Sequence, residues 1–374
     1  MKILFLSRSL ESGGAERQLA VLAAGLSRIG WKVVVVSFYY EGSCGSELEQ
    51  NGVTIRYLHK KGRWDVVGFT LRLIKVIREE CPDIIHGYLP VPNVLSILIR
   101  PFLPPHKLVW GIRASNMEMD QYDWLSRWSY QVESKLSGFA DMIIANSQAG
   151  MEMMREKGFV IDKALMIPNG IDTQKFYPDL AGRARMRDQL GIVAGDKLIG
   201  LVARLDPMKD HATFMHAASY LLKMRENARF VCIGDGPARY RRKLMDLSVD
   251  LGIEDKLVWV CSIDDMAAMY NAFDVATLSS AYGEGFPNVI GEAMACGIPC
   301  VVTNVGDSAY IVGDTGTVVP TRNPEALAHA WNAMLEKIDK DGHELKIRAR
   351  ERLCLLFGDE ALIKQSQQAL LRLI

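Results

Sequence analysis

Short apolar runs alternate with longer amphipathic segments along the whole chain. Residues 2–7 form one such run, followed by a glycine turn at Gly13 and Gly14 and then by leucines and alanines at helical spacing up to Gly30, which predicts a strand, a turn and a helix. The run at 31–39 holds four consecutive valines, and an apolar run without alternation is typical of a parallel strand covered on both faces. The first half therefore predicts a parallel α/β layer. Its further strands are expected at 83–85, 108–110 and 142–145.

The alternation is interrupted once, after the turn at 168–172, by a polar stretch rich in arginine. A linker is predicted there, at 173–195, between a first domain at 1–172 and a second at 196–357. The last helix has an apolar face, and we expect the segment 358–374 to dock back on the first domain. Strands of the second domain are expected at 198–202, 230–233, 257–260, 275–278 and 300–303. The fold class predicted is α/β, with two tandem Rossmann-like parallel-sheet domains.

The composition of the chain mainly excludes classes of function. Lys+Arg and Asp+Glu both number 44, so no global field attracts nucleic acid, and no nucleic-acid partner is expected. The seven cysteines are scattered without a CxxC pair, which supports neither a disulfide framework nor a zinc site. The amino terminus lacks the features of a signal peptide, and the most apolar stretch, 94–103, is interrupted by Arg100 and Pro101 and too short to span a bilayer. We expect a cytoplasmic protein.

Candidate chemistry is sought at the carboxyl ends of strands, where helix N-termini direct backbone N–H groups at anions. Gly13 and Gly14 occupy that place after the first strand, and Gly234 follows the strand at 230–233. A glycine turn there is also ordinary punctuation between strand and helix. The chain has no G-x-G-x-x-G, and the second strand ends without an acidic residue for a ribose, so a nicotinamide-dependent oxidoreductase is disfavoured.

Two cations lie on the first strand-to-helix loop of the second domain. Arg204 and Lys209 are five residues apart, and both could reach a diphosphate, the arginine as a bidentate fork and the lysine as a point charge. A solvated loop is the alternative interpretation.

The segment 283–297 is the most informative. Pro287 suits a first helical turn, which would present the amides around Asn288 to an anion or a hydroxyl. Glu284 lies just before this helix, and Glu292 is one turn beyond Asn288. Two carboxylates so placed can accept hydrogen bonds from sugar hydroxyls. The alternative for Glu292, a surface helix residue, is disfavoured by its small apolar neighbours.

These features together resemble the retaining glycosyltransferases of family 4, which have the GT-B fold of two Rossmann-like domains facing a cleft. The resemblance rests on the Glu284/Glu292 spacing, the preceding residues 279–280, the run at 292–297, the Arg204/Lys209 pair and the segment 168–172. It implies that Glu292 binds the nucleotide ribose, that Glu284 binds the transferred sugar, and that Arg204 and Lys209 hold the diphosphate. The donor-binding set it implies is Gly13, Gly14, Arg204, Lys209, Gly234, Glu284, Gly285, Phe286, Pro287, Asn288 and Glu292.

The chain departs from the family at Arg113. Many members carry a histidine at the place that follows the strand ending at Ile112. Arg113 is interpreted either as a contact for an anionic group on the sugar or acceptor, or as a partner of Glu118, and His86 is a second candidate for the sugar contact. The residues expected to be catalytic are Glu284, Arg204, Lys209 and Arg113.

The expected activity is the metal-independent, retaining transfer of a hexose from a nucleotide-diphosphate sugar to a hydroxyl. The resemblance implies a front-face displacement. It also implies a lipid-linked or saccharide acceptor, because the segments 305–309 and 313–316 are similar to bacterial enzymes that build capsule, exopolysaccharide or O-antigen. No cofactor and no metal site are expected; Asp264 and Asp265 are interpreted as helix capping. A nucleotide-sugar 2-epimerase of the same fold is the main alternative.

A local excess of cations predicts a membrane-facing patch. Residues 56–113 hold ten Lys+Arg against four acids, which favours peripheral association with an anionic membrane. Core packing is the equally weighted alternative for the apolar residues among them, Trp64, Val66, Val67, Phe69, Leu71, Leu73 and Ile74.

Overall fold

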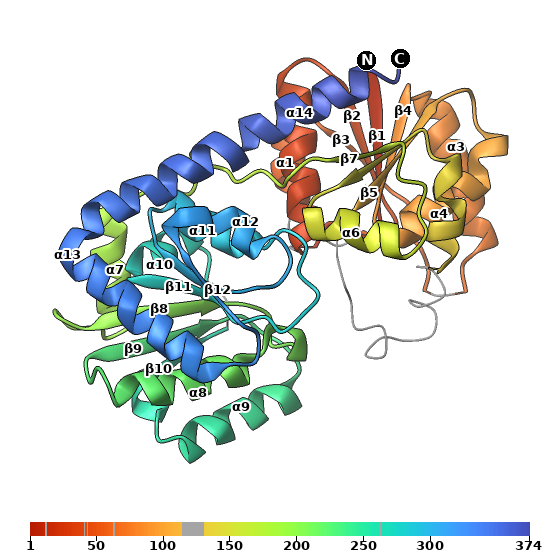
Figure 1. Cartoon of the computed structure of the whole chain (residues 1–374). Helices are drawn as coiled ribbons and strands as arrows, with labels where there is room; N and C mark the ends of the chain where they lie inside the picture. The colour runs from red at the N-terminus through yellow and green to blue at the C-terminus, as the bar shows by residue number, and fades with distance from the viewer. Residues whose placement is uncertain (12, 41, 43, 63, 114–130, 262) are drawn as a thin grey trace. The chain divides into compact units, whose positions relative to one another are not determined.

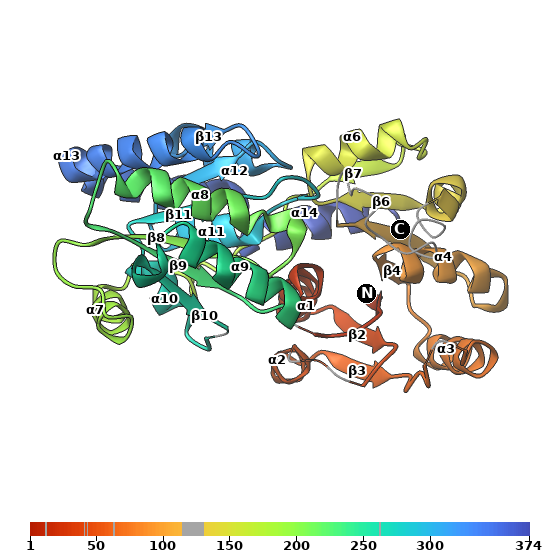
Figure 2. The same ribbon diagram turned by 90° about the horizontal axis from the view of Figure 1, so that it is seen from below.

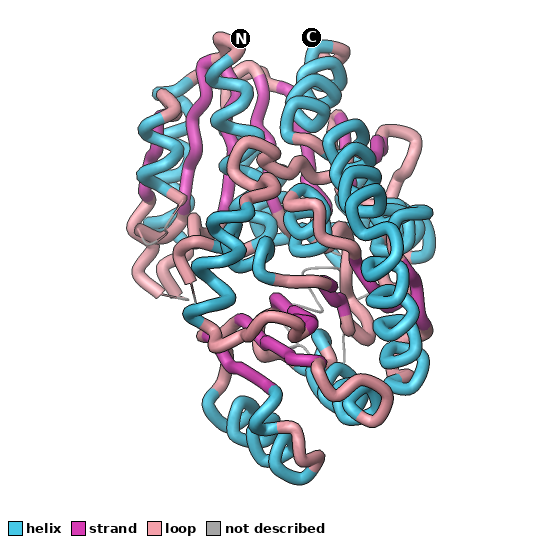
Figure 3. Tube along the Cα trace, turned by 90° about the vertical axis from the view of Figure 1, so that its left-hand side faces the viewer, coloured by secondary structure: helices cyan, strands magenta, loops and turns pink. Residues whose placement is uncertain are grey.

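The chain divides into two compact units, which are described separately (Figure 1). The structure is a computed structural model and describes residues 1–11, 13–40, 42, 44–62, 64–113, 131–261 and 263–374. Unit 1 comprises Met1–Gly170 and Asp359–Ile374, and unit 2 comprises Ile171–Gly358. Each unit is a parallel sheet flanked by helices (Figure 3), so the predicted fold class is confirmed.

Unit 1 is built on a seven-stranded parallel sheet in the order β3-β2-β1-β4-β5-β6-β7. Alternate residues of β1 enter different cores: Ile3 and Phe5 pack on one face, and Leu4 and Leu6 on the other, as expected of a strand covered on both sides. The strands are β1(Lys2–Ser7), β2(Lys32–Ser37), β3(Thr54–Tyr57), β4(Ile84–Tyr88), β5(Lys107–Ile112), β6(Met142–Ala145) and β7(Ala164–Met166). The helices are α1(Gly14–Arg28), α2(Gly45–Gln50), α3(Val67–Glu80), α4(Pro90–Ile99), α6(Gln148–Glu156) and α14(Asp359–Leu371).

Unit 2 is built on a six-stranded parallel sheet in the order β10-β9-β8-β11-β12-β13. Helices α8 and α13 lie side by side over one face (Figure 2), where Phe214 and Trp331 join the core. The strands are β8(Lys197–Val202), β9(Ala228–Ile233), β10(Leu257–Val260), β11(Val275–Leu278), β12(Cys300–Thr303) and β13(Thr317–Val319). The helices are α7(Leu180–Gln189), α8(His211–Leu222), α9(Ala238–Asp250), α10(Met266–Ala272), α11(Asn288–Ala295), α12(Ser308–Val312) and α13(Pro324–Phe357).

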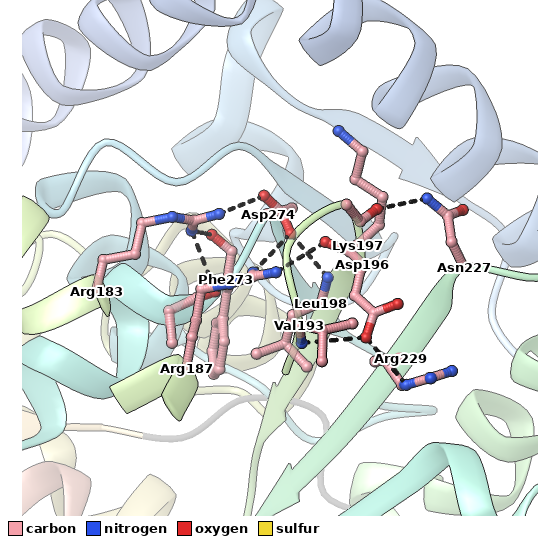
Figure 4. A network of polar contacts seen from close by, with 12 residues as sticks. Arg183, Arg187, Val193, Asp196, Lys197, Leu198, Asn227, Arg229, Phe273 and Asp274 are labelled. Carbon is pink, nitrogen blue, oxygen red and sulfur yellow. Dashed lines mark hydrogen bonds and ion pairs between the residues drawn. The ribbon is translucent and has the colours of Figure 1, made fainter. Parts of the chain in front are cut away.

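The segment 173–195 is part of unit 2 and not a free linker, because its helix α7 is held to the sheet by polar contacts (Figure 4). Arg183 donates through Nη2 to Asp274 Oδ1 at 2.7 Å and through Nη1 to three backbone carbonyls at 271–273. Arg187 donates to Asp274 Oδ2 at 3.1 Å. The same carboxylate oxygen accepts the Leu198 N–H of β8 at 2.8 Å. Asp274 therefore connects α7 to the start of two strands.

The helix α14 packs against α1 within unit 1. Its side chains Leu362 and Leu370 are buried in the same core as Leu19 of α1. The two helices approach closely, because a Cβ added at Gly25 would lie 2.2 Å from the Ile363 side chain. Among the described helices, none has the length and apolarity needed to cross a membrane.

Candidate functional site

The loop that carries Lys209 is fixed by two side-chain caps. Asp206 Oδ1 accepts the Met208 N–H at 2.9 Å. Asp210 has a left-handed backbone with φ of 47°, and its carboxylate accepts both the N–H and the hydroxyl of Thr213, at 3.1 Å and 2.6 Å. These bonds begin α8 and offset the cost of the left-handed residue. The backbone of Lys209 is thereby held at the carboxyl end of β8.

Lys209 and Glu284 are brought together as an ion pair. Lys209 Nζ lies 2.6 Å from Glu284 Oε1, and the two side chains are only 17% and 8% exposed. The same oxygen accepts the Ser280 hydroxyl at 2.5 Å, while the Ser279 hydroxyl donates to the Lys209 carbonyl at 2.7 Å. The serines at 279–280 therefore join the two halves of the site. Their place in the sequence indicates a motif but assigns them no role.

The loop before α11 is clamped from the β12 side. The Thr303 hydroxyl donates to the Ser280 carbonyl at 2.7 Å, and the Asp307 N–H donates to the Gly285 carbonyl at 2.9 Å. Gly306 has φ of +57°, and a Cβ there would lie 2.5 Å from the carbonyl oxygens of both Glu284 and Gly285. Only glycine allows this close approach, so Gly306 helps set the position of Glu284.

Glu292 is buried on α11, which excludes the interpretation as a solvated surface residue. It is 5% exposed, and its Oε2 accepts the Tyr270 hydroxyl at 2.7 Å. Tyr270 comes from α10 and carries no signal in the sequence that would have assigned it to this place. The helix α11 begins at Asn288 with Pro287 at its N-cap, so Pro287 lies just before the first helical turn in which it was predicted. Phe286, just before it, is buried in the core.

Arg204 and Gly234 have surroundings that differ from those of Lys209. The Arg204 side chain is 76% exposed, and its ion pair with Asp206 is long, at 3.8 Å. Gly234 has φ of +142°, and a Cβ there would lie 2.1 Å from the Ala203 carbonyl oxygen. The close approach that this glycine allows is thus to the chain's own backbone beside Arg204.

His211, the first residue of α8, is a buried titratable neighbour that sequence reasoning missed. Burial, with a further contribution from the Lys209 charge, lowers the pKa of His211 to about 4. The imidazole is therefore neutral at pH 7 and adds no charge beside the Lys209–Glu284 pair.

In unit 1, the predicted glycines begin a helix in an ordinary way. Gly14 is the first residue of α1, and Gly13 is its N-cap with φ of −77°. A Cβ on Gly13 would meet the Glu16 carboxylate at 2.2 Å, a flexible group that can move. Neither residue has the left-handed backbone that requires glycine.

Arg113 lies at the carboxyl end of β5 among aromatic and amide groups. It donates through Nη2 to the Tyr88 hydroxyl at 2.7 Å and through Nη1 to Asn169 Oδ1 at 3.3 Å, and its guanidinium carbon lies 4.4 Å from the centre of the Tyr88 ring. Glu118, the alternative partner, lies outside the described residues. His86 is fully buried, and burial together with the Arg113 charge holds its pKa well below the ordinary value.

A second buried group of unit 1 was missed entirely. Glu133 is completely buried, and burial raises its pKa to about 8, against a smaller lowering by its hydrogen bond from Asn93. Asn93 Nδ2 donates to Glu133 Oε1 at 2.7 Å and to the Gly111 carbonyl at 3.3 Å. The acid is therefore largely protonated at pH 7.

No cluster of three or more His, Cys, Asp or Glu within the described parts of the chain is arranged to hold a metal ion. Asp265 is the N-cap of α10, with its carboxylate accepting the Ala268 N–H at 3.0 Å. Its other oxygen pairs with Arg185 at 2.6 Å.

Comparisons with known proteins match each unit to a family. Residues 12–175 match the family described as "Glycosyltransferase Family 4", and residues 196–337 match "Glycosyl transferases group 1". The D-inositol 3-phosphate glycosyltransferase of Streptomyces bingchenggensis is 33% identical over 51% of this chain and 44% of that protein. The UDP-Gal:alpha-D-GlcNAc-diphosphoundecaprenol alpha-1,3-galactosyltransferase of Escherichia coli is 24% identical over 65% of this chain and 63% of that protein. The chain spans about half the length of the curated relatives it matches.

The fold comparison covers the whole chain. Anabaena HepE, solved in complex with UDP-glucose, matches with a TM-score of 0.87 at 23% identity, over 100% of both chains. A sucrose-phosphate synthase from Thermosynechococcus elongatus matches with a TM-score of 0.82 at 21% identity, over 100% of this chain and 99% of that one. Two parallel α/β units, each matched to its own glycosyltransferase domain, place this chain in glycosyltransferase family 4, with the GT-B fold.

Proposed function

We propose that this protein is a retaining glycosyltransferase that moves a hexose from a nucleotide-diphosphate sugar to a hydroxyl of a lipid-linked or saccharide acceptor in surface-polysaccharide synthesis. The observation that carries the proposal is the buried Lys209–Glu284 pair at the strand ends of unit 2, with Glu292 held on the following helix. One relative acts on a diphosphoundecaprenol-linked sugar and another on an inositol phosphate, by their names. A structural neighbour was solved with UDP-glucose, which supports a nucleotide-sugar donor.

Unit 2 would bind the donor. In this assignment Arg204 and Lys209 bind the diphosphate, Gly234 and the backbone at 285–288 lie against it, Glu292 accepts the ribose hydroxyls, and Glu284 accepts hydroxyls of the transferred sugar. Gly13 and Gly14 belong to the same proposed donor-binding set. As the bond between the anomeric carbon and the diphosphate breaks, negative charge grows on the diphosphate and positive charge on the sugar. The cations stabilise the first and Glu284 the second.

The transfer is proposed to proceed on one face of the sugar without a metal ion. The acceptor oxygen forms its bond to the anomeric carbon as the diphosphate leaves from the same face, and the acceptor proton passes to a diphosphate oxygen. Arg204 and Lys209 supply the positive charge that a divalent cation would otherwise provide. An alpha-linked donor then gives an alpha-linked product.

The experiment begins with a thermal-shift panel of nucleotide sugars, because a ligand that binds only the folded state raises its stability by about 2.7 kcal/mol at a hundredfold excess over its dissociation constant. The sugar that stabilises most is then incubated with a polyprenyl-diphosphate sugar and excess chelator, and proton NMR follows the anomeric coupling of the first product. If no nucleotide sugar stabilised the protein, the proposed transfer from a nucleotide-diphosphate sugar would be refuted. An inverted product, or activity abolished by chelation and restored by magnesium or manganese, would refute the retaining, metal-independent assignment.

We also propose that unit 1 associates with the anionic inner face of the cytoplasmic membrane. Three apolar side chains at the start of α3 are strongly exposed: Trp64 by 90%, Val67 by 73% and Leu71 by 63%. Lys75 and Arg78 are exposed further along the same helix. Phe69 and Leu73, also expected in the patch, belong to the core. Exposed apolar side chains beside cations are what an interfacial helix requires.

A further inference from the structure

Four neighbouring strands of unit 1 end in polar side chains. Tyr88 is the last residue of β4, Arg113 directly follows β5, and Asn146 directly follows β6. Asn169 lies shortly after β7. These four strands are adjacent in the sheet. Arg113 contacts Tyr88 and Asn169 from two sides. The Asn146 N–H donates to the Ile112 carbonyl at 3.2 Å, which places Asn146 beside Arg113. The carboxyl edge of this sheet thus carries one continuous polar group.

Several polar atoms of this group are buried and have no hydrogen-bond partner within the described residues. They are Arg113 Nε, Asn146 Oδ1 and both ring nitrogens of His86. Asn146 is 3% exposed and His86 is fully buried. A Cβ on Gly111 would lie 3.1 Å from the Gly87 carbonyl oxygen and 3.4 Å from both Arg113 Nε and His86 Nε2, so these two nitrogens lie close to one another at the ends of β4 and β5. Buried polar atoms are normally paired, and the unpartnered atoms therefore leave hydrogen-bonding capacity at this edge that a ligand can satisfy.

The charge of this group is one permanent cation among neutral side chains. No carboxylate forms an ion pair with Arg113 in the described parts of the chain. His86 is held in its neutral form by burial and by the Arg113 charge, and burial likewise favours the neutral form of Tyr88, whose pKa is raised. Stacking on the Tyr88 ring and the bond to its hydroxyl fix the plane of the guanidinium. A fixed guanidinium fork matches the two oxygens of a phosphate or carboxylate.

We infer that the ends of β4 to β7 form an oxyanion-binding subsite, in which Arg113 supplies the charge and Tyr88, Asn146 and Asn169 position it. Its ligand is a phosphate or carboxylate group carried by the acceptor, an assignment that rests on the proposed function. The acceptor would then be an anionic saccharide or a phosphate-bearing carrier, and a neutral sugar would be a poor acceptor.

The test measures binding to the full chain in the presence of saturating UDP. Three probes share one ring and differ at one carbon: glucose 6-phosphate, glucuronate and glucose, with dissociation constants measured by ligand-observed NMR. One charge-assisted contact predicts that an anionic probe binds wild type at least about tenfold more tightly than glucose. A preference for the phosphate indicates a phosphorylated acceptor, and a preference for glucuronate indicates an acidic sugar.

Arg113→Gln should abolish the preference for the anionic probe, and Arg113→Lys, which keeps the charge and loses the fork, should retain a reduced one. Arg155→Gln, which removes an exposed arginine on α6 of the same unit, is the matched control and should behave as wild type. UDP affinity and the thermal midpoint report whether each variant is folded. Equal binding of the three probes by wild type, or an intact preference in folded Arg113→Gln, would overturn the inference. A protein that fails to bind UDP and nucleotide sugars but shows the Arg113-dependent preference would refute the proposed function and leave the subsite standing.

Discussion

Glu284→Gln should strengthen the binding of a nucleoside diphosphate, although the same substitution should slow sugar transfer. The reason is that Lys209 is already engaged: its Nζ lies 2.6 Å from Glu284 Oε1 in a largely buried pair. A diphosphate that binds Lys209 has to share it with this carboxylate or displace it. Glutamine preserves the shape and the Ser280 contact but removes the competing charge.

The size of the effect follows from the coupling between the two charges. The coupling between opposite charges is about 0.2 to 1 kcal/mol in exposed pairs and about 1.5 kcal/mol or more in close, desolvated pairs. Glutamine leaves Lys209 charged and hydrogen-bonded but removes this coupling, which in the largely buried Lys209–Glu284 pair releases roughly 1 to 1.5 kcal/mol for the incoming diphosphate. The dissociation constant for UDP should therefore fall by about five- to tenfold. Lys209→Met should have the opposite effect and raise it by about ten- to a hundredfold.

Calorimetric titration of UDP into wild type, both variants and Glu344→Gln measures these changes. Glu344 is an exposed carboxylate on α13 of the same unit, so its neutralisation controls for net charge. Turnover of Glu284→Gln should decline even as UDP binds more tightly, since the sugar loses its carboxylate partner. Unchanged or weaker UDP binding by Glu284→Gln, with a wild-type thermal midpoint, would refute the assignment of Lys209 to the diphosphate.

Four further predictions concern other parts of the chain. Asp274→Asn leaves two buried or half-buried guanidinium groups without their carboxylate and should destabilise unit 2 by about 3 to 5 kcal/mol, measured by thermal denaturation together with hydrogen exchange in α7. Glu133→Gln should flatten the pH dependence of stability. In wild type the pKa of Glu133 is raised to about 8 from the ordinary 4.5, so the free energy of unfolding should fall by up to about 1.4 kcal/mol per pH unit as pH rises through that interval. The thermal midpoint measured against pH should show this fall in wild type and not in the variant. Glu292→Ala should raise the Michaelis constant for the donor more than it lowers turnover, as measured by steady-state kinetics, because the ribose contact is made equally in the ground and transition states. Replacing Trp64 and Leu71 together by serine should reduce co-sedimentation with phosphatidylglycerol vesicles at low salt.

Each of these predictions has a result that contradicts it. An Asp274→Asn protein with wild-type stability would show that backbone carbonyls suffice to hold α7. Parallel pH profiles for wild type and Glu133→Gln between pH 5 and pH 8 would mean that Glu133 is ionised in the native state. A Glu292→Ala variant that loses only turnover would exclude a simple ribose contact. Equal sedimentation of wild type with anionic and neutral vesicles would refute the proposed association of unit 1 with an anionic membrane.

The sequence predicted the central strands and one edge strand, β10, and missed the other three edge strands, for a physical reason. Strands covered on both faces, such as β2 and β8, carry short unbroken apolar runs, and β10 has a run of the same kind. The strands β3, β7 and β13 lie at the edges of their sheets, and their side chains are mostly exposed or half-buried. Helix α7 was not predicted for a related reason. Arg183 and Arg187 attach it to the sheet through polar contacts, and a search for apolar periodicity does not detect such contacts.

Within the candidate site, the sequence identified residue types but not their pairing. Loop position and family resemblance predict a ligand contact for Lys209 and for Glu284 separately. Their direct contact joins residues 75 apart in the chain and depends on the adjacency of β8 and β11 in the sheet. Tyr270 and Glu133 carry no local signal at all, since a tyrosine or glutamate in a helix is ordinary until tertiary packing buries it. Burial, and hence each shifted pKa, is a property of the fold and not of the segment.

The loops of unit 2 owe their geometry to close backbone contacts at two glycines and to a side-chain cap at Asp210. Gly234 packs on the Ala203 carbonyl and Gly306 on the carbonyls of Glu284 and Gly285, while Asp210 keeps a left-handed backbone through its bonds to Thr213. None of the three is assigned a sugar or diphosphate contact by its side chain. Each nevertheless fixes the backbone next to a charged residue: Gly234 beside Arg204, Gly306 beside Glu284, and Asp210 beside Lys209. Pre-organisation of this kind holds Lys209 and Glu284 in contact in a largely buried pair before any ligand arrives, and under the proposed function the charge that develops during transfer would meet groups already held near it.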